Sequence, residues 1–290
     1  MQTRHASQLT AFMYIVQTIA ALRLARAAFT SQHLGLVPTM GALHEGHRSL
    51  LRRARHECDV VAASLFVNPL QFAPTEDLAR YPRTFEADCR MLEDEGVDLL
   101  FAPTPAEMYP DGNVTLIHVP GIEGRLDGAS RPGHFTGVAT VVAKLFHITA
   151  PTHAYFGQKD AAQIAVLRQM VRDLNFDLEL IACPTVRDAD GLALSSRNAY
   201  LSSEERARAL ILSGTLRHIA TRITQGILDP TILLAEAHAS LSAETGVTLD
   251  YLAIVDPDTL LPVTLAISGS LVAIAAKIGS TRLIDNLLVP

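Results

Sequence analysis

Hydrophobic and polar positions alternate along the first half of the chain in a pattern typical of strands joined by helices. Short apolar runs predict buried strands over residues 33–39, 60–67, 97–102 and 154–157. Amphipathic stretches between them predict helices over residues 49–58, 85–95, 137–148 and 160–174. Because such alternation gives parallel strands with right-handed crossovers, we expect an α/β fold with a Rossmann-like, doubly wound parallel sheet.

The pattern changes after about residue 187, where a smaller α+β domain is predicted. Residues 203–225 predict a long helix capped by Ser202 or Ser203, and Asp229 with Pro230 predicts the start of another. Strands are expected over residues 249–254, 271–276 and 281–288. We therefore divide the chain into residues 1–186 and residues 187–290.

Two apolar stretches raise the question of a membrane segment. Residues 11–22 are interrupted by Gln17 and Thr18 and continue toward Arg26, which favours an amphipathic helix over a leader peptide. Residues 259–276 carry no charge, but Pro262 and Gly269 break the stretch into a loop and a strand. We therefore expect no membrane partner.

Composition narrows the class of protein further. The chain has 290 residues, of which 49% are hydrophobic and 19% charged, enough apolar surface for a large core. A net charge of −6 argues against a protein that coats nucleic acid. Its three cysteines form no pair at motif spacing, which favours a reducing, cytoplasmic compartment.

The most informative motif spans residues 38–47 and reads Pro-Thr-Met-Gly-Ala-Leu-His-Glu-Gly-His. It follows a predicted strand and opens a helix-like segment, where free backbone N–H groups and the helix dipole suit a phosphate. His44 and His47 are three residues apart, so their imidazoles share a helix face and can donate to phosphate oxygens. The motif predicts a nucleotide site at the carboxyl end of a strand.

Two other interpretations of the histidine pair stay open on the motif alone. The two histidines could be half-buried polar side chains on a helix, without a functional role. A zinc-hydrolase helix requires His-Glu-x-x-His, whereas His44-Glu45-Gly46-His47 is one residue short and no third ligand has the right spacing. We assign no residue as a metal ligand.

Further polar segments could complete a nucleotide site. Lys159 and Asp160 follow a predicted strand, so Lys159 could reach phosphate oxygens and Asp160 could cap the next helix, although a capped helix with a solvated lysine would give the same pattern. Ser195, Ser196 and Arg197 combine two hydroxyls with a guanidinium, as in a phosphate clamp or an ordinary polar loop.

Amides and carboxylates near these segments have weaker signals. Gln71 and Gln163 could orient a hydroxyl or carboxylate without adding charge, although each could also be an unremarkable surface residue. Asp77 and Asp88 could help to position magnesium through water, or could simply be solvated.

These blocks together resemble the pantothenate synthetase (pantoate–β-alanine ligase) family, of the nucleotidyltransferase superfamily with a His-x-Gly-His motif. The likeness covers nearly all of the chain beyond the first ten residues, and the blocks keep the family's order. They are residues 38–47, 66–72, 81–83, 156–160, 194–198, 256–259 and 281–285.

The resemblance implies an ATP-dependent ligase that works through a pantoyl adenylate. Pantoate would attack the α-phosphorus of ATP, and β-alanine would then attack the acyl group, giving pantothenate, AMP and pyrophosphate. The family uses Mg²⁺ with ATP and is usually a homodimer, and its second domain forms a lid. The implied partners are therefore small molecules and a second copy of the chain.

Residue roles carried over from the resemblance fall into three groups. His47 matches the proton donor, while His44, Lys159, Arg197 and the two serines would stabilise phosphate charge, with His44, His47, Lys159 and Arg197 as catalytic residues. Gln71 and Gln163 would hold pantoate. ATP would lie along Met40, Gly41, Ala42, Leu43, His44, Glu45, Gly46, His47, Gly157, Gln158, Lys159, Asp160, Val186, Leu194, Ser195, Ser196 and Arg197.

One position departs from the family pattern, and alternative functions remain. Many relatives have Glu where this chain has Gln158, which puts in doubt any role that needs a carboxylate there. The alternatives are a related adenylyltransferase with another substrate and a non-catalytic nucleotide-binding protein. A tRNA synthetase is disfavoured because no basic surface bias is evident.

Overall fold

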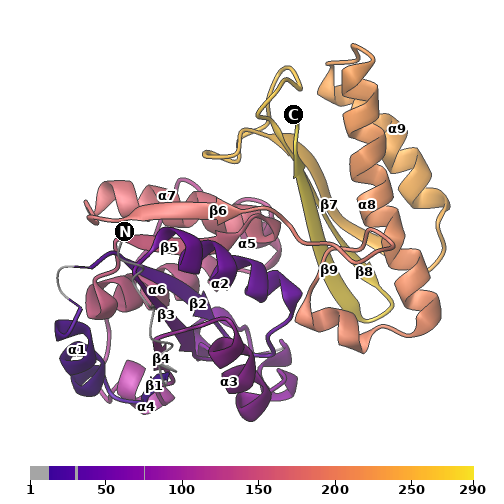
Figure 1. Ribbon diagram of the computed structural model, residues 1–290. Coiled ribbons are helices and arrows are strands. Elements are labelled where there is room, and N and C mark those ends of the chain that lie inside the picture. The colour runs from indigo at the N-terminus through magenta and orange to yellow at the C-terminus, as the bar shows by residue number, and fades with distance from the viewer. Residues whose placement is uncertain (1–12, 30–31, 75) are drawn as a thin grey trace, which may run out of the picture.

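The computed structural model describes residues 13–29, 32–74 and 76–290, which form two parts, each with its own sheet. Figure 1 shows the larger part with its sheet between helices, and the smaller part beside it with α8 and α9 on one face of its sheet. Among the described residues, no helix is long and apolar enough to cross a membrane.

The large sheet has six parallel strands among the described residues, in the order β1-β4-β3-β2-β5-β6. This order confirms the predicted doubly wound, Rossmann-like sheet, because the chain moves outward from β2 in both directions. The strands are β1 (Tyr14–Val16), β2 (Leu34–Thr39), β3 (Val60–Leu65), β4 (Leu99–Phe101), β5 (His153–Gly157) and β6 (Glu179–Cys183).

Helices cover both faces of this sheet. One face packs against α2 and α3 through residues such as Leu51 and Leu92, and the other against α1, α6 and α7 through residues such as Leu22 and Phe146. The helices are α1 (Ile19–Ala27), α2 (Glu45–Glu57), α3 (Phe85–Asp94), α4 (Pro105–Met108), α5 (Asp127–Ser130), α6 (His134–Thr149) and α7 (Ala161–Asp173).

The smaller part is an antiparallel sheet of three strands with two helices, which confirms the predicted α+β pattern. Ser202 caps α8 and forms a capping box with Glu205, and Asp229 caps α9 with Pro230 in its first turn. Its elements are α8 (Ser203–Thr224), α9 (Pro230–Ala243), β7 (Val247–Val255), β8 (Leu271–Ile278) and β9 (Thr281–Leu288).

Two predicted elements need correction, and one strand was missed. The stretch 11–22 is not one helix: Tyr14–Val16 forms the edge strand β1 and α1 starts at Ile19, while residues 11 and 12 lie outside the described residues. The strand Glu179–Cys183 was not predicted at all. The helix expected over residues 49–58 begins four residues earlier, at Glu45.

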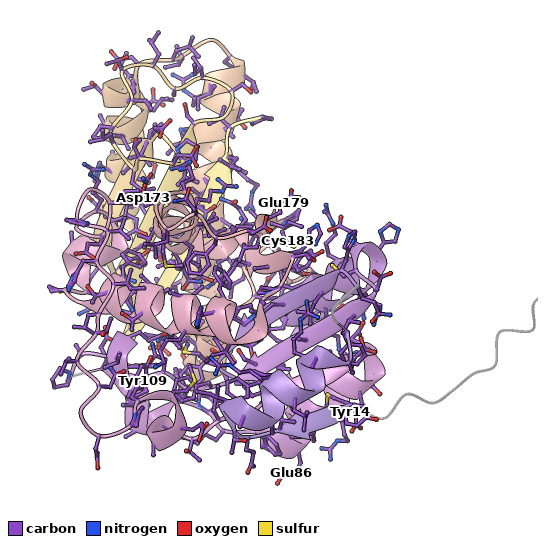
Figure 2. All side chains as sticks on the ribbon, turned by 90° about the vertical axis from the view of Figure 1, so that its left-hand side faces the viewer. Tyr14, Glu86, Tyr109, Asp173, Glu179 and Cys183 are labelled. Carbon is purple, nitrogen blue, oxygen red and sulfur yellow. The ribbon has the colours of Figure 1, made fainter. Side chains whose placement is uncertain are left out.

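The two parts meet through apolar and polar contacts. Leu271 and Ala273 of β8 belong to the same buried cluster as Phe135 and Phe146 of α6. In Figure 2, Glu179 and Cys183 of β6 lie beside the smaller part, whereas Tyr14 of β1 lies at the opposite end of the large one. The interface is thus at the β6 side of the sheet, next to the carboxyl end of β5.

Candidate active site

A cleft of about 240 Å³ opens at the carboxyl ends of β2, β3 and β5. This is the edge at which open α/β sheets bind ligands. The residues after β6 close one side of the cleft. Its lining brings together fourteen of the predicted site residues: Met40, His44, Gly46, His47, Gln71, Gly157, Lys159, Asp160, Gln163, Val186, Leu194, Ser195, Ser196 and Arg197.

Five other predicted nucleotide-binding residues do not line this cleft. Gly41 lines a neighbouring hollow, which also includes Met40 and Asp88. The side chain of Glu45 pairs with Arg52 at 2.5 Å on the outside of α2. Ala42 and Leu43 instead donate their backbone N–H groups to a buried carboxylate, and Gln158 faces β9.

His44 and His47 cap the N-terminus of α2 with their own rings. His44 Nδ1 accepts from the backbone N–H of Gly46 at 3.1 Å, and His47 Nδ1 accepts from that of His44 at 3.2 Å. The ring centroids are 4.2 Å apart. Since each Nδ1 is an acceptor, the neutral rings carry their proton on Nε2, which is left available for a ligand.

The surroundings keep both imidazoles neutral. Burial lowers the pKa of His47 to about 3, with smaller contributions from His44 and Lys159. Burial also lowers the pKa of His44, and Lys159 adds to the shift. In the ligand-free cleft at neutral pH, these rings therefore offer N–H donors rather than positive charges.

The turn between β2 and α2 is held by Asp88 of α3. Its carboxylate accepts from Ala42 N at 3.0 Å and Leu43 N at 2.8 Å, and from Thr84 Oγ1 at 3.1 Å. The turn needs this support because Ala42 adopts a left-handed φ of +51°. The buried Asp88 carboxylate thus has a structural role that the sequence did not predict.

Lys159 and Asp160 form the 3-10 helix η3 (Gln158–Asp160) between β5 and α7. Lys159 Nζ lies 3.5 Å from Asp160 Oδ1, and both residues line the cleft. Asp160 is the N-cap residue of α7 but makes no side-chain capping bond, so the capping role predicted for it is wrong.

The loop after β6 turns back on itself toward the cleft. Leu194 N donates to Val186 O at 3.0 Å, and Arg187 pairs with Ala193 in an isolated bridge. Ser195 then caps the 3-10 helix η4 (Ser196–Tyr200) by accepting from Arg197 N at 3.3 Å. This folding places the two serines and Arg197 at the wall of the cleft.

Gln71 lies deep in the cleft at the end of the 3-10 helix η1 (Pro69–Gln71). Its amide oxygen accepts from Asn68 Nδ2 at 3.1 Å, and its nitrogen points to Met40 Sδ at 3.0 Å. The close approach of α6 requires a glycine, because a Cβ at Gly137 would lie 2.3 Å from Leu70 O. Gln163 lines the cleft from α7.

Sequence reasoning missed or set aside several cleft residues. His134 is one of them: its Nδ1 lies 2.8 Å from Gln71 O and its Nε2 faces Arg131. Burial and Arg131 lower the pKa of His134 to about 4. Ser64 Oγ and Thr185 Oγ1 are buried and have no hydrogen-bond partner in the described structure, and both residues line the cleft. No motif marked them.

A parallel sheet with paired imidazoles at a helix N-terminus, facing a lysine and a serine-arginine loop, defines an α/β enzyme that binds a nucleotide. The family model for pantoate-beta-alanine ligase matches residues 14–288. The chain therefore belongs to the pantoate-beta-alanine ligase family, which confirms the resemblance seen in its motifs.

Individual relatives agree with this assignment. The chain is 56% identical over 279 residues to a pantothenate synthetase of Koribacter versatilis (strain Ellin345), covering 96% of each chain. A pantothenate synthetase structure from Thermus thermophilus superposes with a TM-score of 0.91 at 49% identity, covering 96% of this chain and 99% of that one. A structure of a Francisella tularensis pantoate-beta-alanine ligase complexed with beta-gamma ATP and beta-alanine superposes with a TM-score of 0.81 at 38% identity. That match covers 96% of this chain and 98% of the other.

Proposed function

We propose that the cleft carries out the ATP-dependent condensation of pantoate with β-alanine, releasing pantothenate, AMP and pyrophosphate. One observation carries the proposal: two neutral imidazoles cap the helix at the carboxyl end of β2 and share one cleft with Lys159. Family membership and the ATP- and beta-alanine-bound relative support the same ligation.

The reaction proceeds in two steps through a pantoyl adenylate. A pantoate carboxylate oxygen attacks the α-phosphorus of ATP, a new P–O bond forms, and the bond to pyrophosphate breaks. The amine of β-alanine then attacks the acyl carbon, AMP leaves with the electron pair of the C–O bond, and the amine loses a proton. Adenylation is needed because a free carboxylate has no good leaving group.

Charge on the phosphate oxygens grows in the first step, and fixed donors lower its free energy. His44 and His47 donate from Nε2, while Lys159 and Arg197 supply positive charge. Because the positive end of the helix dipole lies at the same place, the phosphates lie against the start of α2. Ser195 and Ser196 add hydroxyl donors.

The remaining cleft residues are assigned to the nucleotide or to pantoate. The nucleotide extends along the predicted residues that line the cleft: Met40, His44, Gly46, His47, Gly157, Lys159, Asp160, Val186 and residues 194–197. Pantoate lies between Gln71 and Gln163, whose amides bind its hydroxyls and carboxylate without adding charge. The lid role of residues 187–290, and the division of the chain at 186/187, are part of this proposal.

Mg²⁺ enters this proposal as the counter-ion of ATP. It neutralises phosphate charge when bound, and the phosphates themselves supply most of its ligands. Within residues 13–29, 32–74 and 76–290, no three His, Cys, Asp or Glu side chains group as a metal site. The cleft lining includes the carboxylate of Asp160, which lies beside Lys159.

We also propose that the chain is a cytoplasmic homodimer. The three buried cysteines are unpaired by any disulfide, as suits a reducing compartment. Val114 and Leu116 are exposed on a segment outside regular secondary structure, and such side chains favour burial against a second copy. Sedimentation equilibrium at several concentrations measures the mass of the particle directly.

The test of the ligase is pyrophosphate and AMP release from Mg-ATP with pantoate and β-alanine each present or omitted. We expect pyrophosphate release to require pantoate, and AMP with pantothenate to accumulate only when β-alanine is added. Pyrophosphate release that needs a different acid would favour a related adenylyltransferase. ATP binding without any pyrophosphate release would favour a non-catalytic nucleotide-binding protein.

A further inference from the structure

The side chain of Asn286, in β9 of the smaller part, reaches the segment of the large part that carries Lys159. Asn286 is only 4% exposed. Its Nδ2 donates to Gln158 O at 2.9 Å and to Lys159 O at 2.8 Å, while its Oδ1 accepts from Gln158 Nε2 at 3.3 Å. One amide of the smaller part therefore pairs with two consecutive backbone carbonyls of η3.

These bonds fix the backbone from which the Lys159 side chain extends. The two carbonyls determine which way the Asn286 amide points, because only its nitrogen can donate to both. A half-buried carbonyl that loses its donor is destabilised, so η3 is free to move toward another partner. Movement of η3 moves the start of the Lys159 side chain, whose ammonium lines the cleft.

The preceding residue of β9 holds the start of the loop that forms another wall of the cleft. Asp285 is buried and receives two bonds from Arg187, Nη1 to Oδ2 at 2.6 Å and Nη2 to Oδ1 at 2.9 Å. Arg187 begins the loop that turns back to Ser195, and its Nη1 also donates to Gly191 O at 3.2 Å. Two adjacent side chains of β9 thus contact both η3 and the start of the loop.

We propose that Asn286 is a positioning residue for the adenylation step, which holds the backbone of Lys159 at the place where its ammonium meets the phosphates. The proposal rests on the function proposed above. It follows that the smaller part contributes to the chemistry through β9 and not only by covering the cleft. A shift of about 1 Å in a catalytic group can slow a reaction by about 10²-fold.

A double-mutant cycle between Asn286 and Lys159 tests this role. We expect Asn286→Ala to lower kcat for pantoate-dependent pyrophosphate release by about 10- to 100-fold, with the KM for pantoate unchanged. In the Lys159→Ala background the same substitution should cost less than about 2-fold, because the group that Asn286 positions is already absent. Circular dichroism confirms folding of each variant.

Tyr251→Phe is the control for damage to the interface, since it removes a hydrogen bond between the two parts away from the cleft. Tyr251 Oη donates to Asp127 Oδ2 at 3.0 Å, at a part of the interface formed by α5 and outside the cleft lining. We expect this variant to lose stability but to keep its kcat. If Asn286→Ala does not fold, Asn286→Ser enters the same cycle.

Equal losses from the Asn286 substitution in both Lys159 backgrounds, or an unchanged kcat, would overturn the positioning role. A fall in kcat for Tyr251→Phe as large as that for Asn286→Ala would do the same, because interface damage alone would then explain it. Absence of pantoate-dependent release from the wild-type chain is a separate result that would refute the proposed function and this role with it.

Discussion

His47 uses its two ring nitrogens for different purposes. Nδ1 closes the capping box of α2, and Nε2 carries the proton that faces the cleft. Because the pKa of His47 is lowered to about 3, the ring acts in the free enzyme as a neutral hydrogen-bond donor. The role of proton donor, which the family resemblance assigns, requires the bound phosphates to raise that pKa.

Replacing His47 by Ala should therefore affect both activity and stability. We expect pantoate-dependent pyrophosphate release to slow by about 10²- to 10³-fold, as when one oxyanion donor is removed. The lost cap should lower the free energy of unfolding by about 1 kcal/mol. His56→Ala is the control, because His56 is exposed on the same helix; a wild-type rate for the His47 variant would refute its role.

The lowered histidine pKa values also predict how stability depends on pH. The unfolded chain binds protons at histidine near pH 6.5, whereas folded His47 and His134 bind them only near pH 3 and 4. The free energy of unfolding that these two neutral histidines maintain is fully present above about pH 6.5. It falls as the pH drops toward 4, by about 1.4 kcal/mol per pH unit for each histidine.

Urea unfolding between pH 7.5 and 4.5 measures this loss. The His134→Gln variant should show a shallower decline than the wild type, because one of the two histidines no longer titrates.

The same pKa values predict that kcat/KM shows no histidine titration between pH 6 and 8. A stability that is constant from pH 7.5 to 4.5 would contradict both expectations.

At the scale of elements, the turn before α2 depends on a helix that lies beyond the next strand along the chain. Asp88 of α3 accepts both N–H groups that the turn exposes at Ala42 and Leu43. Gly41, at a φ of +85°, starts the turn, and a Cβ there would approach Asp88 Oδ2 at 3.0 Å. The start of α2 is thereby held in place before any ligand binds.

We expect Asp88→Asn to loosen this turn. An amide offers one acceptor oxygen where the carboxylate offers two, so one half-buried backbone N–H loses its partner at a cost of about 1 kcal/mol. The KM for ATP should rise, since the start of α2 is the proposed phosphate site. Asp94→Asn, an exposed position on the same helix, should leave both quantities unchanged, and equal effects of the two substitutions would refute the argument.

How far these elements could be predicted depends on how far apart in the sequence the residues that form them lie. The strands β2, β3 and β5 and the long helices follow from local periodicity, so the fold class was predictable. β1 has three residues within an apolar run of helical period, and Tyr14–Val16 becomes a strand only by pairing with β4. β6 is a short edge strand without a periodic signal.

The topology explains why the predicted cleft residues lie together. It does not predict which residues hold them in place. Strands that end at one edge of a parallel sheet bring His47, Lys159 and the loop after β6 together. The contacts of Asp88 with the turn and of Asn286 with η3 join positions 46 and 128 residues apart. No local pattern encodes such pairs, and a histidine cap lies outside the usual Ser, Thr, Asp and Asn signals.

At the scale of the whole molecule, the two parts are joined by charges as well as by apolar packing. Arg187 lies where the chain passes toward the smaller part, and it binds both oxygens of Asp285 in β9. A second pair, Arg282 of β9 with Asp127 of α5 at 2.7 Å, lies elsewhere on the interface. The orientation of the parts is therefore specified at two separated points.

The final prediction concerns the first of these pairs. Arg187→Met leaves the buried Asp285 carboxylate without its partner, which should cost about 3 kcal/mol, the low end for a buried pair because Arg187 is partly exposed. The double variant with Asp285→Asn should recover much of this loss, since no buried charge remains unpaired. Denaturant unfolding of the four proteins measures the cycle, and strictly additive losses would show that the pair does not couple the two parts.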